Sequence, residues 1–379
     1  MSPVTRIVST LPFHKSPRWT SSVETVAASP SPRPGPWRRA WERMGVPDPS
    51  VISRLLRRAG SADAVLINGG ERADLVYLAL ASLCPWITAP HLIVDAHWQP
   101  GNAWLHRLAQ RLPLWLGRRL LAEVQPHSRE EIPLYVSVFG LPEAVVKPLP
   151  WSTSLTGYDL QRQAEPGEAI VTGGHSYRDY RTLLDAVRGE PWPLRIGLPP
   201  SPVTAQVKAW AADLPNVEVV SDWTFRTYWQ AVADSRVFAM AITPGLQRCT
   251  ADQTICNAMA LGAIVVATNA MSSRIYIDHG RTGFLVPEGD AAAWKRTLAD
   301  VHALPAEKAR AIRSAAQHEA TTRFSEDARI EETLRRARIA AAEWADRGRA
   351  PGRHDAWQWA KAGFVLLLAA KASLLPILL

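Results

Sequence analysis

Residues 250–301 read TADQTICNAMALGAIVVATNAMSSRIYIDHGRTGFLVPEGDAAAWKRTLADV, and this stretch decides the fold. The small-residue segment after Thr254 predicts a helix that ends at Gly262, because glycine accepts the left-handed turn that closes helices. The apolar run AIVVAT (263–268) predicts a buried strand, and the segment 291–301 predicts another helix. A helix of small residues packs closely on the next strand, so the stretch indicates one repeat of an α/β sheet.

The same alternation of apolar strands and helical segments runs through most of the chain. A proline-rich, polar segment interrupts it in the middle, after which it begins again. Strands that alternate with helices form parallel βα units. The sequence therefore predicts two Rossmann-like, doubly wound domains facing a central cleft, with strands expected at 4–10, 63–69, 91–98, 122–128, 169–174, 193–199, 217–223, 237–243 and 263–268.

Composition shifts along the chain set the expected domain boundaries. Residues 1–150 are expected to form the first domain, in which the proline-, serine- and tryptophan-rich segment 15–45 is a mobile arm. Residues 151–167 form the linker, 168–343 the second domain, and 344–379 a basic linker with an apolar tail.

Overall composition restricts the class of protein and its partners. Of 379 residues, 47% are hydrophobic and 21% charged, which is typical of a globular chain, and three cysteines without a C-x-x-C pair indicate a reducing compartment. A net charge of +8 suits anionic partners such as acidic lipid or a phosphorylated substrate, although an arginine-rich solvated surface explains it equally well. No zinc-finger, basic-zipper or RNA-binding aromatic pattern occurs, so a nucleic-acid partner is not expected.

The end of the chain carries the expected membrane contact. Residues 356–379 read AWQWAKAGFVLLLAAKASLLPILL, in which Lys371 divides two apolar runs too short to span a bilayer separately. Trp357 and Trp359 suit the headgroup level. The N-terminus has no apolar stretch typical of a signal peptide. We expect a cytoplasmic protein, peripheral at the inner face of the membrane, whose basic C-terminal region and tail contact anionic lipid.

The strand end TGGHSYR (172–178) offers a candidate anion site in the second half. Gly173 and Gly174 lack side chains, so backbone can approach a phosphate closely, and Arg178 can grip a diphosphate with two hydrogen bonds. A glycine turn followed by a solvated arginine explains the same residues.

The helix predicted after residue 251 offers the second candidate element. Asp252, Gln253 and Thr254 form its first turn, where free amides attract a phosphate and the Gln and Thr side chains add donors. Asn257, one turn further, is expected to bond to ribose hydroxyls. Asp252 has a purely structural alternative as a first-turn acid, and its charge opposes a bound anion.

The first half offers a candidate catalytic histidine. The strand HLIVDAHW (91–98) places Asp95 and His97 at its end, where His97 would polarise or deprotonate a hydroxyl and Asp95 would orient it. Gly69 and Gly70 follow another strand and are expected to line the same cleft. A packed histidine bonded to a carbonyl is the alternative.

Several segments together resemble one family. The run NAMALGAIVVATNAMSSRIYIDHGRTGFLVPEGDAAAW (257–294) strongly resembles the donor-binding region of the group 1, family 4-like glycosyltransferases, which have the GT-B fold. TGGHSYRDYRTLLDA (172–186) is similar to that family's glycine-arginine-lysine element, and LIVDAHW (92–98) to its strand that ends in an acceptor-side histidine. The resemblance covers most of residues 60–343.

This resemblance implies transfer of a sugar from a nucleotide-sugar donor to a glycan or glycolipid acceptor, with retention and without a metal or other cofactor. It implies that Arg178 contacts the donor pyrophosphate and that His97 acts near the acceptor. The family's paired glutamates fall here on Cys249 and Asn257, which are separated by seven residues. A non-catalytic binding or scaffold protein with the same fold is therefore the alternative hypothesis.

Overall fold

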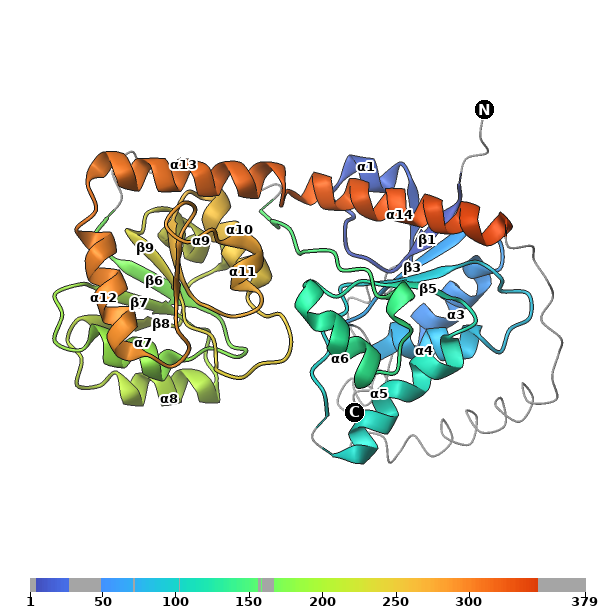
Figure 1. Cartoon of the computed structure of the whole chain (residues 1–379), viewed down its shortest axis with the longest axis horizontal. Coiled ribbons are helices and arrows are strands. Elements are labelled where there is room, and N and C mark those ends of the chain that lie inside the picture. The colour runs from blue at the N-terminus through green and yellow to red at the C-terminus, as the bar shows by residue number, and fades with distance from the viewer. Residues whose placement is uncertain are drawn as a thin grey trace. The chain divides into compact units, whose positions relative to one another are not determined.

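The computed structural model describes residues 5–26, 49–70, 72–101, 103–155, 158 and 167–346 (Figure 1). The chain divides into two compact units, Met1–Leu149 with Ile330–Leu379, and Pro150–Arg329. Each unit is described by itself below. The expected basic linker and apolar tail fall, from residue 347 onward, outside the described residues.

The first unit is built on a parallel sheet. Within the described residues it has five strands in the order β2-β1-β3-β4-β5, and every pair is parallel. Strand side chains alternate between two apolar layers, so Ile7 and Leu66 face one layer while Val8 and Ile67 face the other. The strands are β1 (Ile7–Ser9), β2 (Val23–Thr25), β3 (Ala64–Asn68), β4 (His91–Val94) and β5 (Leu121–Val124).

Helices cover both faces of this sheet (Figure 1). Apolar residues of three helices fill the layer that contains Val8: α3 (Pro49–Ala59), α4 (Arg72–Ala81) and α5 (Trp104–Gly117). The opposite layer is closed by α1 (Pro17–Thr20) and α14 (Glu326–Asp346). Shorter elements follow β5, namely η1 (Arg129–Glu131), α6 (Ile132–Ser137) and η2 (Glu143–Val145).

Two sequence expectations for this unit differ from the structure. The first part of the expected arm 15–45 is folded, because Trp19 on α1 is fully buried and β2 pairs with β1; residues 27–45 lie outside the described residues. The expected second domain, 168–343, included most of α14. Ile330, Leu334 and Ala337 of this helix instead pack against the β1 layer of the first unit.

The second unit contains a parallel six-stranded sheet in the described residues, in the order β11-β10-β9-β6-β7-β8. The strands are β6 (Ile170–Gly173), β7 (Leu194–Gly197), β8 (Val217–Val220), β9 (Val237–Met240), β10 (Ile264–Thr268) and β11 (Phe284–Val286). The doubly wound α/β fold expected from the alternating pattern is thus confirmed in each unit.

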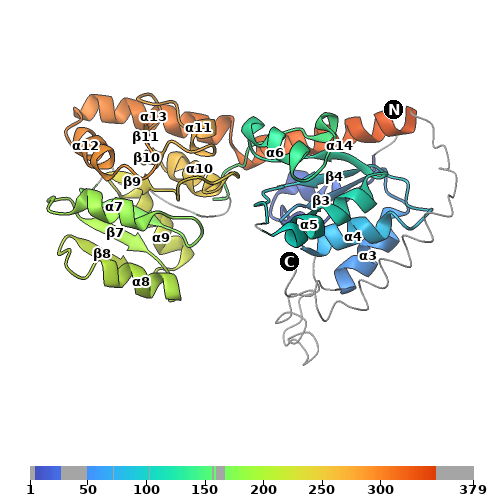
Figure 2. The same cartoon turned by 60° about the horizontal axis from the view of Figure 1, so that its bottom comes forward.

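Helices also lie on both faces of this second sheet (Figure 2). One apolar layer contains side chains of α7 (Tyr180–Val187), α8 (Pro202–Trp210) and α12 (Ala291–His302). The other contains side chains of α9 (Phe225–Ala233), α10 (Asp252–Ala260) and α11 (Ser273–Tyr276), and α13 (Ala306–Thr322) contributes to both layers. Among the described helices, none has the length and apolarity needed to cross a membrane.

Candidate functional site

The strand order of the second unit locates its ligand-binding edge. The chain builds β6, β7 and β8 to one side and then returns to build β9, β10 and β11 on the other. The switch point therefore lies between β6 and β9. In open α/β sheets, ligands bind outside the carboxyl ends of the strands at this point.

The loops after β6 and β9 are joined by backbone bonds at the switch point. Asp179 N donates to Ala241 O at 3.0 Å, and Thr243 N donates to Tyr177 O at 3.0 Å. Arg178 pairs antiparallel with Ile242 between these two bonds. The two loops thus form one surface, on which α10 begins directly after the second loop.

Arg178 lies at the centre of this surface with its guanidinium fixed. Nε donates to Gly173 O at 3.2 Å and Nη1 donates to Ser176 O at 2.7 Å. The side chain is half-buried, and burial lowers the pKa of Arg178, while the charges of Tyr180, Tyr228 and Asp252 oppose this decrease. A cation held in this way is ready to bind an anion without reorganisation.

Close contacts require glycine at both Gly173 and Gly174. A Cβ at Gly173 would lie 2.7 Å from both Gly197 O and Tyr228 Cε2, and one at Gly174 would lie 3.0 Å from Arg178 Nη2. Gly174 also has a φ of +105°, which side chains disfavour. The close approach of a phosphate to these glycines stays a prediction of the sequence.

The N-terminus of α10 lies at the same edge of the sheet. The helix begins at Asp252, and its N-cap position is occupied by Ala251, which has a φ of +68° and no side-chain cap. Gln253 is exposed and Thr254 half-buried. Because the first amides of a helix have no acceptor within it, this turn presents donors to an anion.

Two side chains expected to contact the donor form hydrogen bonds within the protein. Asn257 is fully buried, its Oδ1 accepts from Ser154 N at 2.9 Å, and its Nδ2 donates to Ser154 Oγ at 3.0 Å. Gln253 Nε2 donates to the same hydroxyl at 2.7 Å. Asn257 thus anchors the segment that contains Ser154, and the expected contact with a ribose is not available in this arrangement.

Asp252 follows its structural alternative. Its side chain is buried, and Oδ1 accepts a hydrogen bond from the Tyr276 hydroxyl at 3.1 Å. Burial, and next the charge of Asp252, raise the pKa of Tyr276. Cys249, at the position of one family glutamate, is also buried and presents no carboxylate.

In the first unit, His97 follows β4 with one ring nitrogen fixed. Its Nδ1 lies 2.6 Å from the backbone carbonyl of Asp95. A carbonyl only accepts, so Nδ1 carries the proton and Nε2 of the neutral ring is an acceptor. Gly70 faces this edge of the ring, since a Cβ there would lie 3.2 Å from His97 Nε2 and 2.6 Å from Cε1.

The backbone carbonyl of Asp95 holds His97, whereas the sequence predicted that the side chain of Asp95 would orient it. β4 ends at Val94, and Asp95 has a left-handed φ of +59°, so strand alternation does not extend to these residues. Its Oδ1 lies 3.8 Å from Nε2 of the buried His127. Gly69 borders the same cluster, because a Cβ there would lie 2.8 Å from Ala96 Cα.

Sequence reasoning missed three residues near these two sites. His127 follows β5 as His97 follows β4, and their ring centroids are 6.1 Å apart. Arg248, in the loop before α10, lies over the Tyr177 ring at 5.2 Å. Ser154 belongs to the expected linker. The first two carry a visible signal, a titratable side chain in the loop that follows a strand, whereas Ser154 carries none.

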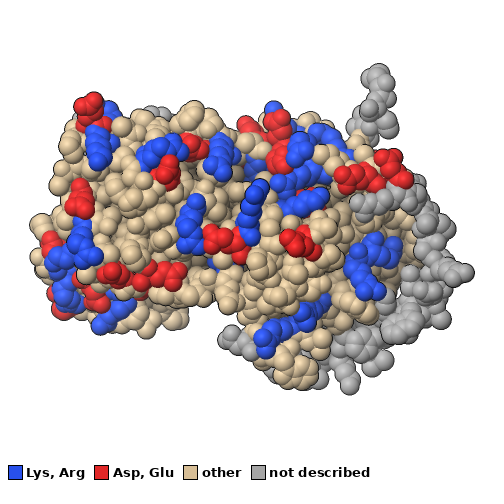
Figure 3. All heavy atoms as spheres, in the orientation of Figure 1, with Lys and Arg blue, Asp and Glu red and all other residues tan. Residues whose placement is uncertain are grey.

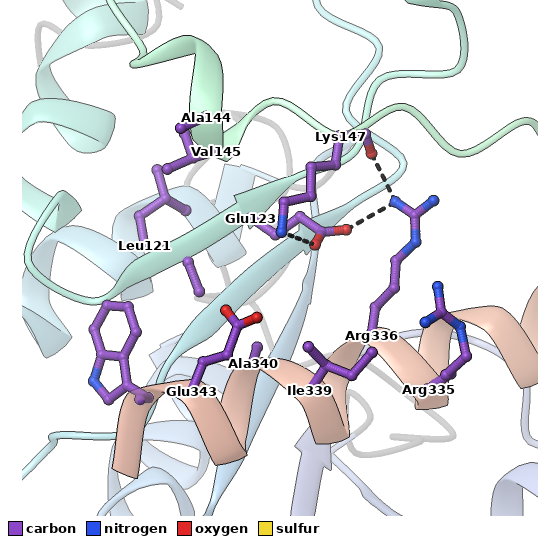
Figure 4. Close-up of a pocket in the computed structure, with 12 residues that line it drawn as sticks. Leu121, Glu123, Ala144, Val145, Lys147, Arg335, Arg336, Ile339, Ala340 and Glu343 are labelled. Atoms are coloured by element: carbon purple, nitrogen blue, oxygen red, sulfur yellow. Dashed lines mark hydrogen bonds and ion pairs between the residues drawn. The ribbon is translucent and has the colours of Figure 1, made fainter. Parts of the chain in front are cut away.

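A separate pocket in the first unit is a poor candidate for the site. It has a volume of about 420 Å³ and lies between α14 and the segments around β5 and η2 (Figure 4). Its charges are paired internally, since Glu123 contacts Arg336 Nη1 at 2.9 Å and Lys147 Nζ at 3.4 Å. Among the described residues, no group of three or more His, Cys, Asp or Glu side chains is arranged to hold a metal ion.

Comparisons with solved structures define the class of fold. A glycosyltransferase from Rickettsia africae ESF-5 has a TM-score of 0.62 and 15% identity, over 89% of this chain and 90% of that chain. Anabaena HepE in complex with UDP has a TM-score of 0.65 and 15% identity, over 88% and 100% of the two chains. Sucrose-phosphate synthase from Thermosynechococcus elongatus has a TM-score of 0.53 and 16% identity, over 84% of each chain. The chain thus has the GT-B fold.

The sequence comparison agrees with this class of fold. Residues 194–303 match the profile of the family described as glycosyl transferases group 1, which confirms the resemblance identified from the sequence. Among curated proteins, no sequence matches the chain significantly.

Proposed function

We propose that the protein is a family 4-like glycosyltransferase, which moves a sugar from a nucleotide-sugar donor to a glycan or glycolipid acceptor with retention and without a metal. The observation that carries the proposal is the fixed guanidinium of Arg178 at the switch point, beside the start of α10. The group 1 profile over residues 194–303 and the UDP complexes of Anabaena HepE support this assignment.

The donor diphosphate would bind at Arg178 and at the amides of Gln253 and Thr254. Negative charge develops on the departing diphosphate, so a preorganised cation and a helix terminus would stabilise the transition state more than the ground state. Gly173 and Gly174 would allow close approach of the phosphates. Arg248 would add a second cation, since its guanidinium lies on Tyr177, the residue before Arg178.

His97 would act at the acceptor end of the reaction. With Nδ1 bonded to the Asp95 carbonyl, Nε2 is the acceptor nitrogen of the neutral ring and would accept a hydrogen bond from a sugar hydroxyl. The exposed Gly70 keeps side-chain bulk away from this edge of the ring. Asp95 would act through His127, which lies within 3.8 Å of its carboxylate.

The second candidate function is a non-catalytic binding protein with the same fold. It is favoured by the buried Cys249 and by the bonds of Asn257 to Ser154, because neither residue presents a carboxylate to a donor sugar. Such a protein would bind a nucleotide sugar without transferring or hydrolysing it.

The proposed setting is polysaccharide or glycolipid synthesis at the cytoplasmic face of the membrane. The basic composition and the apolar segment 356–379 support this setting. The acceptor would then reach the enzyme from the lipid phase or as a growing glycan.

The first test is nucleotide binding measured by calorimetry with UDP, GDP, ADP and TDP. Arg178→Ala is expected to lower the affinity for the nucleotide that binds best by about tenfold to a hundredfold, because the substitution removes charge-assisted hydrogen bonds to phosphate. Arg181→Ala is the matched control. Arg181 lies on α7 one turn away, 62% exposed and paired with Asp185, and its removal should leave affinity unchanged. Equal affinities for both variants would contradict the proposed donor site.

The second test separates transfer from binding. His97→Asn is expected to retain nucleotide affinity while losing release of nucleotide diphosphate from a panel of nucleotide sugars. If the wild-type chain binds a nucleotide sugar and releases no diphosphate with any acceptor, the non-catalytic alternative is supported instead.

A further inference from the structure

Helix α5 presents an unusual outward face. Trp104, Leu108 and Trp115 are 68%, 52% and 42% exposed, which is more than large apolar side chains on a helix normally show. At about 100° per residue they lie on one stripe about 40° wide. A soluble helix normally presents charged residues on such a face.

The charged residues of this face are all arginines. Arg107, Arg111 and Arg118 are exposed and extend the same stripe to an arc of about 100°. Residues 101–119 contain four arginines and no Asp or Glu. Figure 3 shows basic side chains without acidic neighbours at the lower edge of the first unit, where α5 lies in the same orientation (Figure 1).

A groove borders the stripe at its N-terminal half. It has a volume of about 390 Å³ and is lined by Trp104, Arg107, Leu108, Arg111 and the C-terminal end of α6. Arg111 is fixed there, because Nε donates to Val138 O and Nη2 donates to Ser137 O at 2.5 and 2.7 Å. An aromatic ring, an aliphatic side chain and two guanidinium groups thus surround a space of headgroup size.

A loop held by a residue just after α5 carries a further exposed tryptophan. Arg119 holds this loop by donating to four carbonyls, including Ser82 O at 2.6 Å and Cys84 O at 2.8 Å. The loop carries Trp86, which is 64% exposed. Exposed tryptophan therefore occurs both on α5 and beside its C-terminal end.

We propose that this α5 face, defined by Trp104, Arg107, Leu108, Arg111, Trp115 and Arg118, docks the protein on an anionic phospholipid bilayer. Tryptophan and leucine gain free energy at the boundary of headgroups and acyl chains, while arginine pairs with lipid phosphate. A bound RNA would use the arginines but would not bury Leu108. This surface is distinct from the C-terminal apolar segment and does not depend on sugar transfer.

The test is sedimentation of the full chain with vesicles, without nucleotide. Vesicles of phosphatidylcholine mixed with phosphatidylglycerol are expected to bind the protein, more weakly at high salt, and vesicles of phosphatidylcholine alone to bind it less. The variant Trp104→Ser/Leu108→Ser/Trp115→Ser is expected to lower the partition coefficient at least tenfold. Arg107→Glu/Arg118→Glu is expected to remove the preference for phosphatidylglycerol.

Matched controls come from the second unit. Val203→Ser/Phe225→Ser removes apolar side chains that are 36% and 47% exposed. Arg181→Glu reverses the charge at an exposed position. Neither variant should alter the partition coefficient. An unchanged partition of the α5 variants, or an equal loss in the controls, would overturn the proposal. Loss of RNA binding or of self-association in the α5 variants, with vesicle binding intact, would also overturn it and assign the face to that partner.

Discussion

His91 is a fully buried histidine whose two ring nitrogens are both satisfied inside the first unit. Nδ1 lies 2.9 Å from Ala89 O, and Nε2 lies 2.8 Å from the hydroxyl of Tyr77. The neutral ring therefore donates from Nδ1 and accepts at Nε2. Burial lowers the pKa of His91 to about 4, although the bond to Ala89 opposes this decrease.

This pKa predicts a pH dependence of folding stability. A histidine with a lowered pKa in the folded state favours unfolding at acid pH, because the unfolded chain binds the proton first. The contribution of neutral His91 to the free energy of unfolding is present above pH 6.5 and is lost as the pH falls toward 4. Between pH 6.5 and 4.5 we expect a loss of about 2 kcal/mol from this group. This loss can be measured by urea unfolding of the first unit at each pH, with hydrogen exchange in β4 as the probe.

The control for this prediction replaces His91 with glutamine, which does not titrate. His91→Gln should be less stable at pH 7 but should lack the additional loss below pH 6.5. His106→Gln is a second control, since His106 is only half-buried on α5. If His91→Gln retains the full dependence of the wild type, another group causes it.

Single residues also show what the sequence could not predict. The position of Asn257 one turn into a helix was clear from the pattern TADQTICNAMALG, and the helix begins at Asp252 as expected. Its partner Ser154 lies 103 residues away, in a segment without periodicity, so no local pattern indicates the bond. For Asp95, a left-handed φ of +59° reverses the strand alternation on which the prediction depended.

At the scale of elements, most of α14 was assigned to the expected second domain, whereas the structure places it in the first unit from Ile330 onward. Periodicity shows which face of a helix is apolar, but not which apolar layer will cover it. Ile330 and Leu334 pack in the layer of β1, while Arg336 reaches the edge strand β5 of the same sheet. The strands and helices themselves could be predicted because their periods of 2 and 3.6 are local properties.

The contact of α14 with β5 leads to the second stability prediction (Figure 4). Arg336 Nη1 donates to Glu123 Oε1 at 2.9 Å and to Lys147 O at 2.9 Å, and the Glu123 side chain is only 4% exposed. Arg336→Met leaves a buried carboxylate with Lys147 as its remaining cation. Removing one partner of a buried pair costs about 3 kcal/mol, so we expect a loss of about 2–3 kcal/mol in urea unfolding of the first unit.

The neighbouring residue supplies the matched control. Arg335 is 58% exposed and pairs with Glu332, and such surface pairs contribute little to stability because water and salt screen the charges. Arg335→Met should therefore be nearly neutral. Adding Glu123→Gln to Arg336→Met should recover part of the loss, because it neutralises the buried charge. Equal losses for Arg335→Met and Arg336→Met would show that exposure does not decide the effect.

At the scale of the whole molecule, each unit contains its own two apolar layers. The restart of the strand and helix pattern after residue 167 predicted two such cores. It did not predict that the chain returns to the first unit at Ile330, because the apolar face of α14 would suit either sheet. The first unit is therefore made of two chain segments, and the second of one.

This division predicts where a bound nucleotide will stabilise the protein. Ligand at a hundred times its dissociation constant stabilises the state that binds it by about 2.7 kcal/mol. If the diphosphate binds at Arg178 and the start of α10, hydrogen exchange should slow in β6, β9 and α10, all of which belong to the second unit. Exchange in β3 and β4 should not change, because none of the described residues from 150–329 belongs to the apolar layers that hold these strands. Arg178→Ala should abolish the protection at the same nucleotide concentration. Protection that is equal in β4 and β6, or that survives in Arg178→Ala, would place the nucleotide elsewhere.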